Sequence, residues 1–263
     1  MVSSKKVMQG VLCALLAVVL ALVLLVRVKV IYAANLTPSA SPAPSFDVLA
    51  STVIRTPDPT NPSIAQTPEV TPNPKGLPRI DLSSWQYKLA SAANPIGDYA
   101  PPELTELEWY NAFDSRAAVS LMNFVEAGRA EGLTVVMQST YRSYDEQNYI
   151  FNQKVQELGG DAERAATIVL PAGTSEHQLG LCADITDGNY EVLTQDLENT
   201  ATYQWLLAHC AEYGFILRYP ADKEDITGVI YEPWHFRYVG EEAAAYIMEH
   251  GLCLEEFLAL YDE

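Results

Sequence analysis

Positively charged residues are scarce in this chain of 263 residues. Lysine and arginine total 16, against 34 aspartate and glutamate residues, which gives a net charge of -18 and an isoelectric point near 4.5. Phosphate contacts need clustered lysine and arginine, so no nucleic-acid partner is expected. Histidine and cysteine number only four each, which leaves few residues for metal or redox chemistry. Hydrophobic residues make up 49%, which excludes a wholly disordered chain.

The charge is divided unevenly along the chain. Residues 1–34 hold four basic residues and no acidic one, and residues 35–79 hold three of each. Residues 80–263 hold the remaining 9 basic and 31 acidic residues. Three segments with three charge states indicate three physical environments. We therefore expect an N-terminal membrane segment, a linker and a folded domain, in that order.

The first segment is predicted to contain a single transmembrane helix. An apolar run covers residues 7–26, with Lys5 and Lys6 before it and Arg27 and Lys29 after it. About 20 apolar residues span a bilayer as a helix, whereas the apolar core of a cleaved signal peptide is usually shorter. The residues after the run make a poor cleavage site, so we expect an uncleaved anchor, with a long signal peptide as the alternative. Because basic residues flank both ends of the run, the positive-inside rule scarcely distinguishes the two orientations of the helix.

Residues 35–79 are predicted to form an extended or disordered linker. They contain ten prolines, with serine and threonine in much of the remainder. Proline at this density removes backbone donors and prevents helix formation. A polyproline-like chain rises about 3.1 Å per residue, so the segment would reach on the order of 100 Å. It would hold the following domain away from a membrane.

Residues 80–263 are predicted to fold as an α+β domain, with helices packed on a small antiparallel sheet. Asp114 or Ser115 should cap the first long helix, and a capping box at Ser143 should open the second. The buried face of this second helix should hold three apolar residues: Ile150, Phe151 and Val155. The other expected helices are 161–169, 198–213, 241–250 and 254–261, and the expected strands are 133–137, 182–185, 215–219 and 229–239.

Two short stretches, around His177 and His235, concentrate residue types that bind metals. A catalytic zinc takes three protein ligands and keeps one position for water, and His177, Asp184 and His235 supply such a set. Pro233 disfavours a regular strand between Glu232 and His235, because proline cannot donate to the ladder. A bend there would turn both side chains toward one metal, where Glu232 would act as general base. Spacing alone leaves a purely structural role open.

Five ordered motifs lie between residues 140 and 240. They are Thr140-Tyr-Arg-Ser143, Ser175-Glu-His-Gln-Leu-Gly-Leu-Cys-Ala-Asp184, Tyr213-Gly-Phe-Ile-Leu-Arg-Tyr-Pro220, Lys223-Glu-Asp-Ile-Thr-Gly228 and Glu232-Pro-Trp-His-Phe-Arg-Tyr-Val-Gly240. In this order they resemble the VanY-type zinc D-alanyl-D-alanine carboxypeptidases, over about residues 85–245. The resemblance implies one zinc ion with His177, Asp184 and His235 as its ligands, and Glu232 as the catalytic base.

Further site residues are expected from the resemblance together with the local sequence. Arg142, where a strand ends and a capped helix begins, is expected to contact the substrate carbonyl and to stabilise the charge that develops there. Ser175 lies two residues from His177, so in extended chain it faces the same pocket. Three more positions match residues that line the peptide site in similar enzymes, with helix-surface exposure or ordinary packing as the alternative: Gln147, Tyr219 and Trp234.

Cysteine marks one departure from the family pattern. The family usually has alanine two residues before Asp184, and this chain has Cys182. We expect a small buried residue there, with direct zinc contact as the alternative, because residues two apart in a strand face the same way. A disulfide between Cys210 and Cys253 would leave Cys182 free, but three cysteines need not pair.

The resemblance implies a zinc-dependent carboxypeptidase that removes the C-terminal D-alanine from peptidoglycan stem peptides. Together with the anchor and linker, it predicts a single-pass membrane protein whose catalytic domain lies outside the cytoplasm, in a bacterial envelope. The alternatives are an L,D-carboxypeptidase acting on tetrapeptide stems and a peptidoglycan-binding module with an idle metal site. The intact Glu232 argues against the idle module, since a pure binder needs no base.

Overall fold

The structure is a computed structural model that describes residues 76–188 and 193–262. The expected membrane segment, residues 7–26, and almost all of the expected linker lie outside these ranges. Within the described ranges, no helix combines the length and the apolar character needed to cross a bilayer.

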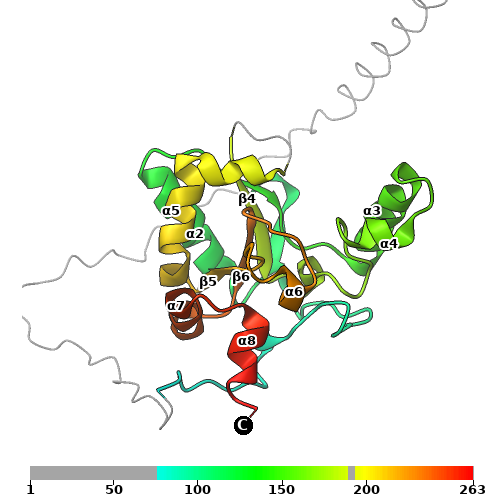
Figure 1. Ribbon diagram of the computed structural model, residues 1–263. Helices are drawn as coiled ribbons and strands as arrows, with labels where there is room; N and C mark the ends of the chain where they lie inside the picture. Colours follow the sequence, from blue (N-terminus) through cyan, green and yellow to red (C-terminus); the bar gives the residue numbers. More distant parts are fainter. Residues whose placement is uncertain (1–75, 189–192, 263) are drawn as a thin grey trace, which may run out of the picture. The chain divides into compact units, whose positions relative to one another are not determined.

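A four-stranded antiparallel sheet forms the centre of this domain (Figure 1). Its strands, in spatial order, are β3 (Val135–Ser139), β4 (Cys182–Asp187), β6 (His235–Tyr238) and β5 (Phe215–Leu217). A separate antiparallel pair joins β1 (Leu104–Glu106) to β2 (Ala112–Asp114). The predicted α+β class, with helices beside a small antiparallel sheet, is confirmed.

The helices lie to both sides of the sheet. In Figure 1, α2, α5 and α7 gather on one side, while the pair α3–α4 projects on the other as an arm. The α-helices are α2 (Ala118–Ala130), α3 (Tyr144–Glu157), α4 (Ala162–Ala166), α5 (Ala201–His209), α6 (Glu224–Thr227), α7 (Glu241–His250) and α8 (Leu254–Ala259). The 3-10 helices are η1 (Trp85–Tyr87), η2 (Glu108–Tyr110), η3 (Glu176–Leu179), η4 (Gln195–Asn199) and η5 (Cys210–Tyr213).

Helix α2 packs on the sheet through the apolar face that its sequence predicts. Leu121, Phe124 and Val125 are fully buried, and the Phe124 ring stacks on those of its neighbours in α5 and β5. The predicted cap is wrong, because the helix begins at Ala118 with no side-chain cap. Asp114 lies in β2 instead, where its carboxylate accepts hydrogen bonds from the Arg116 guanidinium.

Helix α3 begins as predicted and packs differently. Ser143 and Glu146 form the full capping box, with the Glu146 carboxylate accepting from the Ser143 backbone N–H at 2.8 Å. The predicted burial of Ile150, Phe151 and Val155 is wrong: all three are only half-buried and belong to none of the hydrophobic clusters of the described residues. The reason is tertiary, since α3 pairs with the short α4 and not with the sheet. Gln147 is the buried residue of this helix.

Strand β6 is shorter than the sequence pattern predicts. The expected strand 229–239 reduces to His235–Tyr238, and residues before it form a turn. Pro233 cannot donate to a ladder, and the His235 N–H bonds the Glu232 carbonyl at 3.2 Å, which closes the turn. Cys182, Cys210 and Cys253 are all free and buried, so the Cys210–Cys253 disulfide does not form here.

Candidate functional site

The strand register places Asp184 beside His235. The two residues are direct partners between β4 and β6. On the other edge of β4, Asp184 also pairs with Ser139, after a register shift that follows Met137. Irregular pairing of this kind is common beside functional sites, because it re-aims side chains. A carboxylate and an imidazole are thereby held on one face of the sheet.

His177 reaches the same place from η3. This short helix ends at Gly180, whose φ of 66° is left-handed, so the chain turns directly into β4. His177 Nδ1 lies 2.5 Å from the Thr140 carbonyl oxygen. A carbonyl only accepts hydrogen bonds, so Nδ1 carries the proton and Nε2 is the nitrogen left to bind. His177 Nε2 lies 3.3 Å from Asp184 Oδ2.

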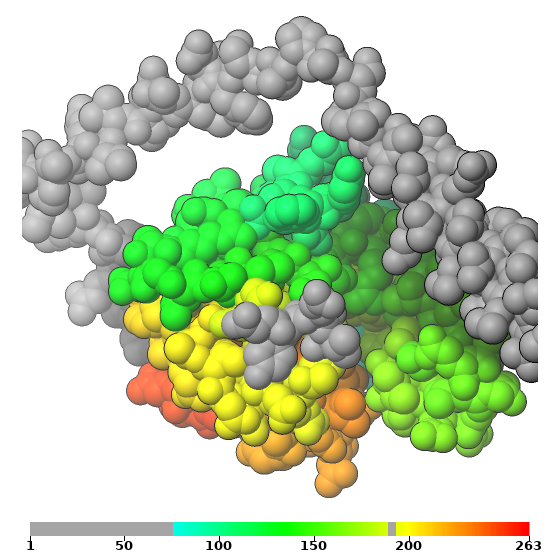
Figure 2. Space-filling view, turned by 90° about the horizontal axis from the view of Figure 1, so that it is seen from above, coloured from blue at the N-terminus to red at the C-terminus, as the bar shows by residue number. Residues whose placement is uncertain are grey.

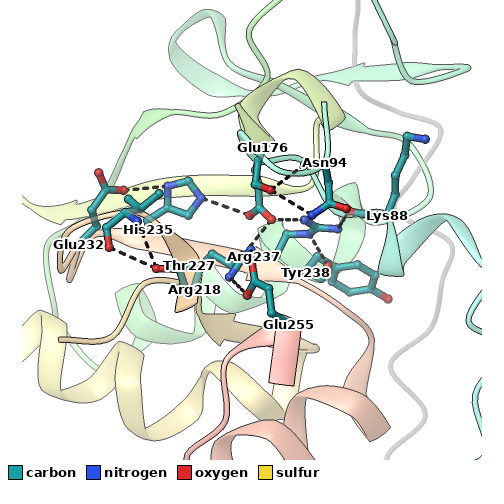
Figure 3. Close-up of polar contacts among 12 residues, drawn as sticks. Lys88, Asn94, Glu176, Arg218, Thr227, Glu232, His235, Arg237, Tyr238 and Glu255 are labelled. Carbon is teal, nitrogen blue, oxygen red and sulfur yellow. Dashed lines mark hydrogen bonds and ion pairs between the residues drawn. The ribbon is translucent and has the colours of Figure 1, made fainter. Parts of the chain in front are cut away.

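His235 completes this cluster at the start of β6. Its Nδ1 lies 3.3 Å from Asp184 Oδ1 and 3.3 Å from Glu232 Oε2. The His177 and His235 rings stand edge to face, with centroids 5.1 Å apart. Figure 3 shows Glu232 and His235 turned toward one another, as the predicted bend at Pro233 requires. The structure therefore brings together all three predicted metal ligands and the predicted base.

The donor set fits a divalent metal ion. Three buried side-chain atoms in the described part of the chain have no hydrogen-bond partner: Glu176 Oε2, Asp184 Oδ1 and His235 Nε2. Asp184 and His235 belong to this cluster, while Glu176 Oε2 lies 3.7 Å from His235 Nε2 on its far side. Unsatisfied buried polar atoms are costly enough to need an explanation. Imidazole nitrogens and a carboxylate oxygen are ligands that zinc accepts. An ion held by Asp184 Oδ1 would give this oxygen the partner that it lacks.

The charges of the cluster are strongly coupled. Burial and the Arg142 guanidinium both lower the pKa of His177, but Cys182 and Asp184 outweigh them and raise it to about 9. Burial raises the pKa of the Cys182 thiol, yet His177 and His235 outweigh it and lower the value to about 7. Burial likewise opposes the charged form of Asp184, but the two imidazoles hold its pKa well below the ordinary value. The surroundings thus favour the charged form of the Asp184 carboxylate next to the His177 and His235 imidazoles.

A buried ionic network lies behind His235 (Figure 3). Glu176 Oε1 accepts hydrogen bonds from Arg218 Nε at 2.9 Å and from Arg237 Nη1 at 2.6 Å. The other nitrogens of Arg218 bond the Glu255 carboxylate of α8 at 2.8 and 2.6 Å. Glu176 Oε2 lies 3.7 Å from His235 Nε2. Burial opposes the charged form of Glu176, but the two arginines outweigh it and hold its pKa well below its usual range, so the carboxylate is charged.

Sequence reasoning missed this network. Its signal is present, because Arg218 and Arg237 each interrupt a short apolar strand segment and both are fully buried. Charged residues are almost never fully buried unless they are paired. The partner, Glu176, is adjacent to His177 in sequence but meets the arginines only through the tertiary fold.

A cavity of about 550 Å³ opens beside the cluster. In Figure 2 the lime-green arm formed by α3 and α4 lies next to the orange stretch of the chain near residue 225, and residues of both regions line this cavity. All nine side chains predicted for the site line it: Arg142, Gln147, Ser175, His177, Asp184, Tyr219, Glu232, Trp234 and His235. The residues that the sequence predicts for the site therefore line one cavity in the fold.

Arg142 is held firmly at the wall of this cavity. Its Nη1 donates to Gln147 Oε1 at 2.7 Å, its Nε donates to Ser139 Oγ at 3.1 Å, and its Nη2 lies 3.6 Å from Asp184 Oδ2. Gln147 in turn donates to the Leu170 carbonyl at 2.6 Å and is 1% exposed. The alternative that Gln147 is an ordinary helix-surface residue is therefore wrong. Gln147 fixes the direction of the Arg142 guanidinium.

The aromatic residues combine packing with contact to the cavity. The centroids of the Tyr219 and His235 rings lie 4.8 Å apart, edge to face, and Tyr219 limits how that imidazole can turn. Trp234 packs in a small hydrophobic cluster with Leu197, Tyr203 and Leu217. Both side chains also line the cavity, so packing and substrate contact are compatible for each. Ser175, at 4% exposure, lies at the start of η3 and lines the cavity as well.

Replacing Glu176 by glutamine should lower the free energy of unfolding by about 3–5 kcal/mol, because Arg237 would stay buried without the carboxylate that pairs with it. The matched control is Glu126→Gln, because the Glu126 side chain is 59% exposed and pairs with Arg129 on α2; this substitution should cost about 1 kcal/mol or less. Urea-induced unfolding measures both. A loss for Glu176→Gln no larger than that of the control would show that the network does not hold the fold together.

Comparison with known proteins agrees with this geometry. The pattern of the family described as "VanY: D-alanyl-D-alanine carboxypeptidase" matches residues 111–241, which include every predicted site residue. A D-alanyl-D-alanine carboxypeptidase of Enterococcus faecalis is 38% identical over 203 residues, which cover 74% of this chain and 74% of the relative.

Solved structures give the same result. VanY from a VanB-type resistance cassette, a D,D-pentapeptidase in complex with Zn(II), is 39% identical, with a TM-score of 0.59 over 66% of this chain and 99% of that one. The complex of VanYB with D-alanine-D-alanine is 38% identical, with a TM-score of 0.61 over 68% and 99%. The LD-carboxypeptidase LdcB is 39% identical, with a TM-score of 0.53 over 62% and 76%. The chain belongs to the VanY family of D-alanyl-D-alanine carboxypeptidases.

Proposed function

We propose that this chain is a zinc-dependent D,D-carboxypeptidase that hydrolyses the C-terminal D-alanine from peptidoglycan stem peptides. The observation that carries the proposal is the single cavity on which three metal-ligand side chains, a carboxylate and a guanidinium converge. The relative from Enterococcus faecalis and the VanYB complex with D-alanine-D-alanine support this substrate class. The Zn(II) complex of VanY supports the choice of metal.

His177, Asp184 and His235 would hold one zinc ion. The nitrogens that face Asp184 are Nε2 of His177 and Nδ1 of His235. The hydrogen bond to Thr140 fixes the orientation of the first ring, and Tyr219 packs against the second. When bound, zinc polarises a carbonyl group and lowers the pKa of a bound water.

Glu232 is proposed as the general base. Its side chain is 15% exposed, lines the cavity and lies beside His235 without being one of the three ligands. It would take a proton from the attacking water and pass it to the leaving amine of D-alanine. The backbone N–H of Glu232 donates to the Tyr219 carbonyl at 3.1 Å, which fixes the base relative to the sheet.

Arg142 is proposed to stabilise the charge that develops on the carbonyl oxygen of the scissile bond. Its side chain is 22% exposed and lines the cavity wall. Gln147 and Ser139 hold it in place before substrate arrives, and donors that are already oriented need no reorganisation during the reaction. Ser175, Tyr219 and Trp234 would contact the peptide.

The second candidate is an L,D-carboxypeptidase acting on tetrapeptide stems, and the similarity to LdcB favours it. The two bonds differ only in the stereocentre on the acyl side. We favour the D,D activity because this chain aligns with 99% of the VanYB chain and with 76% of the LdcB chain.

We also propose that residues 7–26 anchor the protein in the cell membrane and that residues 35–79 carry the domain outward. The length of the apolar run supports the anchor, and an extracytoplasmic substrate supports the orientation. The protein would then be a single-pass membrane protein of the bacterial envelope.

Product analysis on matched stem peptides tests the proposed activity. A pentapeptide stem ending in D-Ala-D-Ala should release D-alanine, and a tetrapeptide stem should release it at least about tenfold more slowly, a difference of about 1.4 kcal/mol in transition-state binding. Mass spectrometry of the products measures both. The reverse preference would establish the L,D activity, and no release from either stem would indicate an idle binding module.

The substitution Glu232→Gln separates chemistry from metal binding. It should keep zinc, fold and substrate binding, because the amide has nearly the same shape and the ligands are untouched. Turnover should fall by about 10²–10⁴, the usual share of acid–base catalysis, or roughly 3–5 kcal/mol of barrier. The matched control, Glu241→Gln on the exposed start of α7, should keep full turnover. Near-normal hydrolysis by Glu232→Gln would refute its role as base.

The anchor is tested on the mature protein. If residues 7–26 are an uncleaved anchor, N-terminal sequencing of the protein extracted from membranes should find the segment still attached. A mature chain that starts near Asn35 would mean that the segment is a signal peptide.

A further inference from the structure

The two faces of β4 have different surroundings. Ala183 and Ile185 point into the main hydrophobic cluster. Cys182 is fully buried as well, but it belongs to none of the three hydrophobic clusters that the described residues form. Successive residues of a strand point to opposite faces, so Cys182 lies on the face that carries Asp184. The thiol is thus placed among the polar residues of the site and not in the core.

The imidazoles of His177 and His235 lie close to the Cys182 thiol. The sulfur of Cys182 and one ring nitrogen each of His177 and His235 all lie within 4.8 Å of one another, and all three residues are buried. Zinc binds thiolate at about 2.3 Å and imidazole at about 2.0–2.1 Å, so tetrahedral ligands lie roughly 3.5 Å apart. Shifts of about 1 Å, within the reach of side-chain rotation, would bring these donors to one ion.

Cys210 provides the contrast within the same domain. It is also fully buried and free, but it belongs to the main hydrophobic cluster, and its thiol points to the Leu207 carbonyl at 3.6 Å. Burial raises the pKa of this thiol to about 12, as is expected for a cysteine that acts as a small apolar residue. Burial alone therefore does not account for the position of Cys182 between two histidines.

We propose that Cys182 is a fourth protein donor to the metal ion that His177, Asp184 and His235 hold, an inference that rests on the proposed function. Four protein ligands give the closed coordination typical of structural zinc sites, whereas three leave the open position that catalysis needs. The metal would therefore have a tightly held form with the thiolate bound and an open form with it released. Thiolate is a soft ligand, so the site would prefer zinc, cobalt and cadmium to magnesium and calcium.

Cobalt(II) substitution tests the proposal on the full chain. The metal-stripped protein loaded with cobalt(II) should show the near-ultraviolet charge-transfer absorption of a thiolate–cobalt bond. Cys182→Ala should lose this absorption, although the other three cysteines remain. Its zinc affinity, measured by competition with a chelator, should fall at least about tenfold, since even indirect partners of a metal ligand are worth 10–100-fold. The matched control, Cys210→Ala, should keep the absorption and the affinity.

The outcomes distinguish this inference from the function on which it rests. Wild-type protein that binds cobalt(II) without thiolate absorption, or an unchanged zinc affinity in Cys182→Ala, would overturn the inference and leave the three-ligand zinc site standing. Wild-type protein that binds neither metal would overturn the proposed function itself. Because alanine removes volume, Cys182→Ser serves as a second variant of nearly the same size. Thermal unfolding of the metal-free proteins verifies that each variant is folded.

Discussion

The site depends on a charge that the fold buries and neutralises. The Glu176 side chain is fully buried, and removing a carboxylate from water is tolerated only when paired donors compensate for the lost hydration. Arg218, directly after β5, and Arg237, in the neighbouring strand β6, supply these donors, and Glu255 extends the network to α8. Because this network links η3, the end of β5, β6 and α8, it fixes the position of each relative to the others. His235, which faces this carboxylate, takes its place from the same network.

The strands add the geometry that chemistry requires. Pairing of β4 with β6 sets Asp184 opposite His235, and the left-handed Gly180 lets His177 enter from η3. The turn at Pro233 brings Glu232 back to the same side. Each of these is a local backbone feature, and they converge on one cavity beside the buried charges that link η3 to β6 and to the end of β5. Stability and function therefore share the same residues at this end of the sheet.

Much of the site could be predicted from the sequence. What could not be predicted depends on contacts between residues that are far apart in the chain. The metal-binding stretches, the bend at Pro233 and the capping box at Ser143 are local patterns, and each of them is present in the fold. The burial of Phe151 was predicted from helix periodicity, which says which face is apolar but not what covers it; in the fold α3 pairs with α4 and stands away from the sheet. Glu176 gave no local signal, because its partners lie about 40 and 60 residues further along the chain. The surroundings of Cys182 likewise depend on contacts that strand pairing creates.

The central claim is that His177, Asp184 and His235 hold one zinc ion. Metal analysis of the full chain and of His177→Ala and His235→Ala, each purified with zinc and dialysed under the same conditions, tests it most directly. The account predicts one zinc per chain in the wild type and a large loss of zinc in both variants, because each removes one of three protein ligands. Full zinc occupancy in either folded variant would contradict it.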